Sequence, residues 1–189
     1  MSEPDQETTA PALPDRYWLL TWTTYGTWLP GDRRRFVSTV KDGPGPQVRH
    51  NKPGTAYDSN QPGLQRSAAS LMKSAPIRLT STQAIAVSQQ IAETCAWRGW
   101  TLLAVAVMAN HAHAVIGVPG DPEPSTILRD LKSYASRRLN AEHSKPANGT
   151  WWTQSGSKRK LPDGAAVVAA IHYIRQQQHA LSVWTHDDA

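Results

Sequence analysis

The sequence predicts an α+β fold of the ferredoxin-like class, a β-α-β-β-α-β sandwich with an antiparallel sheet plus an extra C-terminal helix that carries a tyrosine. Two apolar runs, Thr101–Met108 and His111–Val118, are rich in Val, Leu and Ile, and only two residues separate them. This spacing is typical of neighbouring strands near a sheet centre. Helical patterns before and after the pair complete the order, and we expect the helices to cover one face of the sheet.

The first half of the sandwich follows from local signals. Residues 17–25 are aromatic and β-branched, which favours a first strand. Residues 81–98 have the spacing of a helix, with Ser81 or Thr82 as its cap and Gly99 as its end.

The second half begins with a helix that Ser125 would cap and that runs to about residue 142. Residues 148–161 predict a fourth strand with its exit loop. Residues 163–178 predict the extra helix, whose apolar stripe includes Ile171 and Ile174.

The domain organisation is one domain over residues 16–184, since a chain of 189 residues can bury one core. Residues 1–15 are acidic and rich in Pro and Thr, and we expect them to be disordered. Residues 38–76 lack a persistent pattern and are interpreted as a long loop insertion with one short helix near 63–73.

Charge and composition are compatible with a nucleic-acid partner. The net charge is +5, and the four acidic residues of 1–15 leave +9 on the rest of the chain. Eight Trp against one Phe could stack on unpaired bases or simply fill the core. The lone Cys95 excludes an internal disulfide, and neither a signal peptide nor a bilayer-spanning stretch is evident. We therefore expect a cytoplasmic, nucleoid-associated protein with no membrane partner.

Three basic groups are candidates for contacts with DNA phosphates, the alternative being ordinary solvated surfaces. They are Arg33, Arg34 and Arg35; Lys132, Arg137 and Arg138; and Lys158, Arg159 and Lys160.

Two histidines begin the second central strand. Because strand side chains alternate, His111 and His113 point to the same face, roughly 6.6 Å apart along the strand. Together they can bind one metal ion if a third ligand comes from elsewhere, although paired surface histidines are an alternative. In the last predicted helix, Tyr173 and Gln177 stand four apart and share a face. Tyr173 points away from the apolar stripe, so it is either simply exposed or faces a functional site.

These residues resemble the single-tyrosine HUH transposases, which include small insertion-sequence transposases and REP-associated tyrosine transposases. The resemblance spans residues 17–178 apart from the insertion. Residues 107–113 (VMANHAH) resemble the family's V-M-P-N-H-V-H segment, and residues 171–177 (IHYIRQQ) resemble its Y-I-x-x-Q helix. The basic helix 131–140, the pair Trp151 and Trp152, and the opening segment 24–32 also resemble parts of the family. Ala109 replaces the usual proline and Ala112 the larger middle residue, but neither change removes a ligand.

The resemblance implies a mechanism and a partner. Tyr173 would be the nucleophile, and His111, His113 and Gln177 would bind Mg²⁺ or Mn²⁺. The enzyme would cleave and rejoin single-stranded DNA beside a hairpin through a 5′-phosphotyrosine intermediate, either as a monomer or as a homodimer with shared active sites. Tyr134 is a competing nucleophile, but the resemblance places the nucleophile in the last helix.

Two other functions stay open on the sequence alone. The chain could be a metal-dependent hydrolase that uses the histidine pair. It could also be a domesticated, non-mobile protein of the same fold that binds single-stranded or hairpin DNA.

Overall fold

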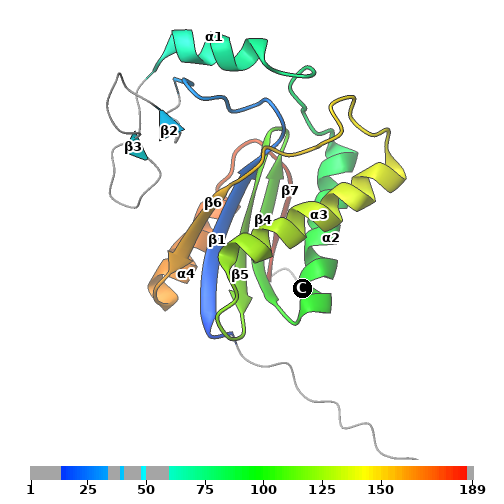
Figure 1. Ribbon diagram of the computed structural model, residues 1–189. Helices are drawn as coiled ribbons and strands as arrows, with labels where there is room; N and C mark the ends of the chain where they lie inside the picture. The colour runs from blue at the N-terminus through cyan, green and yellow to red at the C-terminus, as the bar shows by residue number, and fades with distance from the viewer. Residues whose placement is uncertain (1–13, 34–38, 41–47, 50–59, 187–189) are drawn as a thin grey trace, which may run out of the picture.

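The computed structural model describes residues 14–33, 39–40, 48–49 and 60–186, and Figure 1 shows the arrangement of its elements. The strands are β1 (Arg16–Thr23), β2 (Thr39–Val40), β3 (Val48–Arg49), β4 (Thr101–Met108), β5 (His111–Val118), β6 (Ser157–Leu161) and β7 (Ala180–Thr185). The helices are α1 (Pro62–Ser70), α2 (Ser81–Arg98), α3 (Pro124–Glu142) and α4 (Gly164–Arg175).

One antiparallel sheet organises the molecule. Its strand order is β6-β1-β5-β4-β7, while β2 and β3 pair separately. The first four strands of that order, together with α2 and α3, form the predicted β-α-β-β-α-β sandwich. The α+β fold class and the bounds of the central hairpin, β4 and β5, are confirmed.

Helices cover both faces of the sheet, which corrects the expectation that they lie on one. Helices α2 and α3 pack on the face that carries Leu20, Trp22 and Val107. Helix α4 packs on the opposite face, against β4, β5 and β7, as Figure 1 shows. The alternation of each strand therefore divides the core in two, and the second half includes Val115 and Ile174.

The C-terminal part of the chain differs from the prediction. Helix α4 ends at Arg175, and the chain then adds a fifth strand, β7, to the free edge of β4. The predicted fourth strand is shorter than expected, because residues 148–156 contribute only an isolated bridge between Trp152 and Thr24 before β6 begins.

Helix starts also differ by a residue. Thr80, rather than Ser81 or Thr82, caps α2 in a reciprocal capping box with Gln83. Helix α3 begins at Pro124 without a side-chain cap, so Ser125 lies inside it.

Only parts of the predicted N-terminal segment and of the insertion are described. Of residues 1–15 the structure describes Pro14 and Asp15, and Asp15 bonds to Val118 and Gly120. Within the insertion, the short helix is α1. In the described ranges, no helix combines the length and apolar character that crossing a bilayer requires.

Candidate active site

The two histidines lie on the α4 face of the sheet, at the start of β5. His111 pairs across the strands with Thr23, and His113 with Thr21, so all four side chains share that face. The two imidazole rings are 4.9 Å apart at their centroids and nearly perpendicular. His113 is 5% exposed, whereas His111 is half-buried. The shared face predicted from strand alternation is confirmed.

Hydrogen bonds fix the orientation of both rings. Thr21 Oγ1 lies 2.7 Å from Nδ1 of His113, and Asn110 Oδ1 lies 2.7 Å from Nδ1 of His111. Because an amide oxygen only accepts, the Nδ1–H of His111 donates to Asn110. This tautomer leaves Nε2 of His111 as its acceptor atom, and His113 takes the same tautomer when its Nδ1–H donates to Thr21 Oγ1, the arrangement that outer-shell partners give metal-binding histidines.

Sequence reasoning missed Thr21 and Asn110 as supporting residues. The sequence indicates Asn110 only as a turn residue, although its place directly before His111 lets it reach that ring. Thr21 lies on the predicted first strand, but only the register between β1 and β5 places it opposite His113.

Burial keeps His113 neutral. Desolvation, with a smaller contribution from the charge of His111, lowers the pKa of His113 from 6.5 to about 4. At neutral pH the ring therefore holds a lone pair for a metal ion or for a hydrogen-bond donor.

Tyr173 reaches the same site from α4. Its hydroxyl lies 3.5 Å from Nε2 of His113, and the two ring centroids are 5.2 Å apart. Apolar neighbours such as Ile174 anchor α4 to the sheet, while Tyr173 remains 48% exposed. A phenol on a rigid helix, open to solvent and adjoining two imidazoles, can act on a substrate that lies across this face.

Gln177 lies beyond the end of α4. Its side-chain Nε2 donates to the main-chain oxygen of Tyr173 at 3.1 Å. In the described part of the chain, no three His, Cys, Asp or Glu side chains form a metal-binding group.

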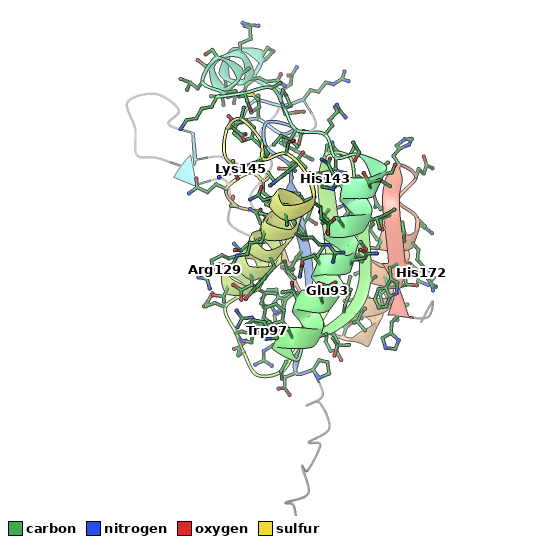
Figure 2. All side chains as sticks on the ribbon, turned by 90° about the vertical axis from the view of Figure 1, so that its right-hand side faces the viewer. Glu93, Trp97, Arg129, His143, Lys145 and His172 are labelled. Carbon is green, nitrogen blue, oxygen red and sulfur yellow. The ribbon has the colours of Figure 1, made fainter. Side chains whose placement is uncertain are left out.

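The competing tyrosine lies far from the histidines. Tyr134 packs against Trp97 with ring centroids 5.7 Å apart, where α2 and α3 meet on the opposite face of the sheet. Figure 2 looks onto these two helices and shows Trp97 on α2, with His172 on the other side of the sheet.

The basic residues of α3 occupy different environments. Lys132 is half-buried, and its amino group donates to the carbonyls of Thr153 and Ser155. Burial, with a smaller contribution from Lys158, lowers the pKa of Lys132 from 10.5 to about 8. Arg138 bonds to Glu93, Glu142 and Gln89, and so connects α3 to α2. Arg137 is exposed and lies over the ring of Tyr134.

The basic run of β6 is exposed and divides between the two faces of the sheet. Lys158 and Lys160 pair with Leu20 and Trp18 on the α3 face, whereas Arg159 pairs with Leu19 on the histidine face. Arg33 is exposed. Arg34 and Arg35 lie outside the described residues.

Comparison with known families identifies the chain. The family model described as "Transposase IS200 like" matches residues 73–177. The chain belongs to the IS200-like transposase family. His111, His113, Tyr173 and Gln177 all lie inside the matched segment, whereas β1 and α1 precede it. Membership in a transposase family makes the chain a DNA-cleaving enzyme by class.

Two solved structures are remotely similar to this IS200-like chain. One is a REP-associated tyrosine transposase bound to a REP hairpin, at 15% identity and a TM-score of 0.47, covering 92% of this chain and 70% of that one. The other is a protein from Deinococcus radiodurans R1 named as a transposase, at 16% identity and a TM-score of 0.41, covering 95% and 99%. No curated protein matches the sequence significantly.

Proposed function

We propose that this IS200-like transposase cleaves and rejoins single-stranded DNA through a covalent 5′-phosphotyrosine on Tyr173. The observation that carries the proposal is the approach of the Tyr173 hydroxyl to within 3.5 Å of Nε2 of His113, beside the second imidazole. A nucleophile and two imidazoles on one solvent-open face are groups that phosphoryl transfer to a side chain can use.

The reaction exchanges one phosphoester for another. The Tyr173 oxygen attacks the phosphorus, the bond from phosphorus to the 3′ oxygen breaks, and that oxygen takes up a proton as a free 3′-OH. The phenol proton passes to solvent, which reaches Tyr173 because nearly half of the side chain is exposed. Attack by a 3′-OH on the phosphotyrosine reverses these steps, so the stored ester allows rejoining without ATP.

The histidine pair fits a divalent cation, Mg²⁺ or Mn²⁺. Both Nδ1 atoms are hydrogen-bonded and His113 is neutral, which leaves Nε2 of each ring as the donor; Gln177 would supply an oxygen. The ion, when bound, polarises the phosphate as a Lewis acid. EDTA should therefore stop cleavage, and His111→Ala or His113→Ala should do the same. Full activity in EDTA would remove the metal from the mechanism.

Single-stranded DNA suits this surface better than duplex DNA. The nucleophile lies on a helix and needs in-line access to one phosphate, while the faces of unpaired bases are open to stacking on aromatic side chains. A hairpin could supply the duplex part that is recognised, and cleavage would occur in the adjacent single strand.

The test uses labelled oligonucleotides from the DNA that flanks the gene, single-stranded or annealed to their complements, with Mg²⁺ or Mn²⁺. On denaturing gels we expect cleavage and a protease-sensitive adduct on the single strand only. Tyr173→Phe should abolish both without weakening DNA binding, whereas the control Tyr134→Phe should leave both.

Other outcomes select the alternatives. A free 5′-phosphate without any adduct, or equal cleavage of both substrates, would indicate a metal-dependent hydrolase. Binding without cleavage under every condition would indicate a non-mobile DNA-binding protein of this fold.

A further inference from the structure

Two cavities adjoin each other along residues 150–154, in the connection between α3 and β6. The first has a volume of about 580 Å³ and is mainly apolar; its lining includes Tyr25, Trp28, Leu71 and Met72. The second has a volume of about 390 Å³ and is lined by Arg129, Lys132 and Lys158 among hydroxyl-bearing side chains. We call them the apolar cavity and the basic cavity. Both volumes fall in the range of ligand pockets, roughly 300–1,000 Å³.

The two cavities share one wall, which also contacts the strand beside the histidines. Thr150, Trp152, Thr153 and Gln154 line both. Thr153 Oγ1 accepts a hydrogen bond from Thr23 Oγ1 at 2.9 Å, and Thr23 is the cross-strand partner of His111. Thr153 therefore connects the shared wall of the two cavities to the strand residue that pairs with His111.

The outer wall of the apolar cavity comes from outside the family match. Leu71 and Met72 follow α1 and precede residue 73, where the match begins. Two hydrogen bonds to Tyr25 hold this segment in place. The main-chain N–H of Lys73 donates to the Tyr25 hydroxyl, and the main-chain N–H of Ile77 donates to the Tyr25 carbonyl. Part of the cavity wall therefore lies outside the segment that the family model matches.

Close packing also fixes α1 itself. Gly31 has a φ of +89°, and a Cβ there would lie 2.5 Å from the carbonyl oxygen of Gln61 and the amide nitrogen of Gln65. Only glycine allows this approach, so the turn after β1 determines where α1 lies.

Charge complementarity indicates the ligand. The basic cavity offers the exposed side chains of Arg129 and Lys158, while the amino group of Lys132 is bound to the carbonyls of Thr153 and Ser155. The apolar cavity offers Trp28, which is 37% exposed, and the ring of Tyr25. An aromatic surface beside a cationic one suits an unpaired nucleotide, whose base stacks while its phosphates bind cations.

We propose that the apolar cavity takes one unpaired base of the single-stranded substrate and the basic cavity takes the adjoining phosphates, so that α1 and the turn after β1 select the base beside the active site. This inference rests on the proposed function, since it assumes a single-stranded DNA substrate. It assigns a specificity-determining role to residues that the family match leaves out.

The test compares two probes that carry the same phosphates, a (dT)₁₂ oligonucleotide and a 12-mer of abasic nucleotides, on the full chain with Tyr173→Phe to prevent cleavage. Trp28→Ala should weaken binding of (dT)₁₂ by roughly 5- to 150-fold, the range for stacking of one base, and leave the abasic probe unchanged. Trp28→Phe should retain most of the affinity. Arg129→Gln with Lys158→Gln should weaken both probes by a similar factor.

Two further variants keep the result interpretable. Leu71 is 82% exposed, so Leu71→Gln cannot disturb the core and should also lower affinity for (dT)₁₂ alone. Trp97→Ala changes an exposed tryptophan that lines neither cavity and should affect neither probe. If Trp28→Ala and Leu71→Gln leave the difference in affinity between (dT)₁₂ and the abasic probe unchanged, the apolar cavity does not bind a base.

The adduct assay separates the two proposals. If the wild type forms the adduct but Trp28→Ala leaves the difference in affinity between the two probes unchanged, this inference is overturned and the proposed function stands. If the wild type binds neither probe, this inference fails, while the proposed function is still decided by adduct formation on the flanking DNA.

Discussion

The imidazole rings of this transposase owe their orientation to two uncharged residues, Thr21 and Asn110. Neither follows from the sequence in the way that His111 and His113 follow from strand alternation. The spacing of two histidines on one strand is a local property, whereas the position of Thr21 depends on the register of two strands that are distant in the chain. Supporting residues of a site are therefore harder to predict than its first ligands.

Removing the hydroxyl of Thr21 should weaken metal binding without unfolding the protein. Thr21→Val preserves shape but leaves Nδ1 of His113 without its partner, so we expect a loss of roughly 10- to 100-fold in affinity for Mn²⁺. Titration calorimetry measures this. Thr23→Val is the matched control, because Thr23 lies on the same face but bonds to Thr153. Equal losses in the two variants would contradict the role of Thr21.

The buried imidazole of His113 should make stability depend on pH. Its pKa is 6.5 in the unfolded chain and about 4 in the folded one, so between these values the unfolded state binds the extra proton. The free energy of unfolding should therefore fall as the pH drops from 6.5 to 4, by at most about 3 kcal/mol. Urea denaturation across this range in EDTA measures the slope, and His113→Gln should flatten it. An unchanged slope in His113→Gln would mean that folding does not alter the pKa of His113.

Among the elements, β6 has basic side chains that alternate between the two faces of the sheet. Arg159 faces the histidine side, and Lys158 lines the basic cavity on the other side. The sequence showed a basic run, but only the pairing of β6 with β1 divides it between faces.

Neutralising β6 should reduce the salt dependence of DNA binding. For a single strand, each cation that no longer binds a phosphate reduces the slope of log K against log salt concentration by about 0.7. We expect Lys158→Gln and Arg159→Gln each to reduce it by about that amount, measured by fluorescence anisotropy. Arg138→Gln is the control: its side chain bonds to α2, so it should cost about 1 kcal/mol of stability and leave the slope unchanged. Unchanged slopes for β6 would assign its charges to a solvated surface.

The elements differ in how far local sequence determines them. Helix α2 has a capping box and a terminating Gly99 at φ +66°, and its predicted bounds are correct. Helix α4 lacks a glycine at its end, so its sequence pattern extends to residue 178, past the true end of the helix, and hides β7. A six-residue edge strand depends on its partner, here β4, more than on its own sequence.

In the whole molecule, Tyr173 and the two histidines meet within one chain. The hydroxyl of Tyr173 approaches His113 of the same subunit, so a complete site does not require exchange of α4 between subunits. Mixing His113→Ala with Tyr173→Phe should therefore yield no adduct.

The two variants are refolded together, and a denaturing gel measures whether the mixture forms the adduct. Wild type mixed with either variant is the control that activity survives refolding. Restored cleavage in the mixture of the two inactive variants would establish the alternative, a homodimer whose active sites combine histidines from one subunit with the tyrosine of the other.

The path of α4 has a consequence for how DNA would move. The helix connects β6 at one edge of the sheet to β7 at the other, and Arg175 bonds to Thr185 of β7. Twelve residues of helix measure about 18 Å, close to the ~19 Å across five strands. Only two residues connect β6 to the helix and four connect the helix to β7, so a large outward swing of α4 would be resisted by both connections. A 5′ end attached to Tyr173 would thus stay in place, and the partner 3′ end would have to travel to it. The choice of what is joined would then depend on the motion of the DNA.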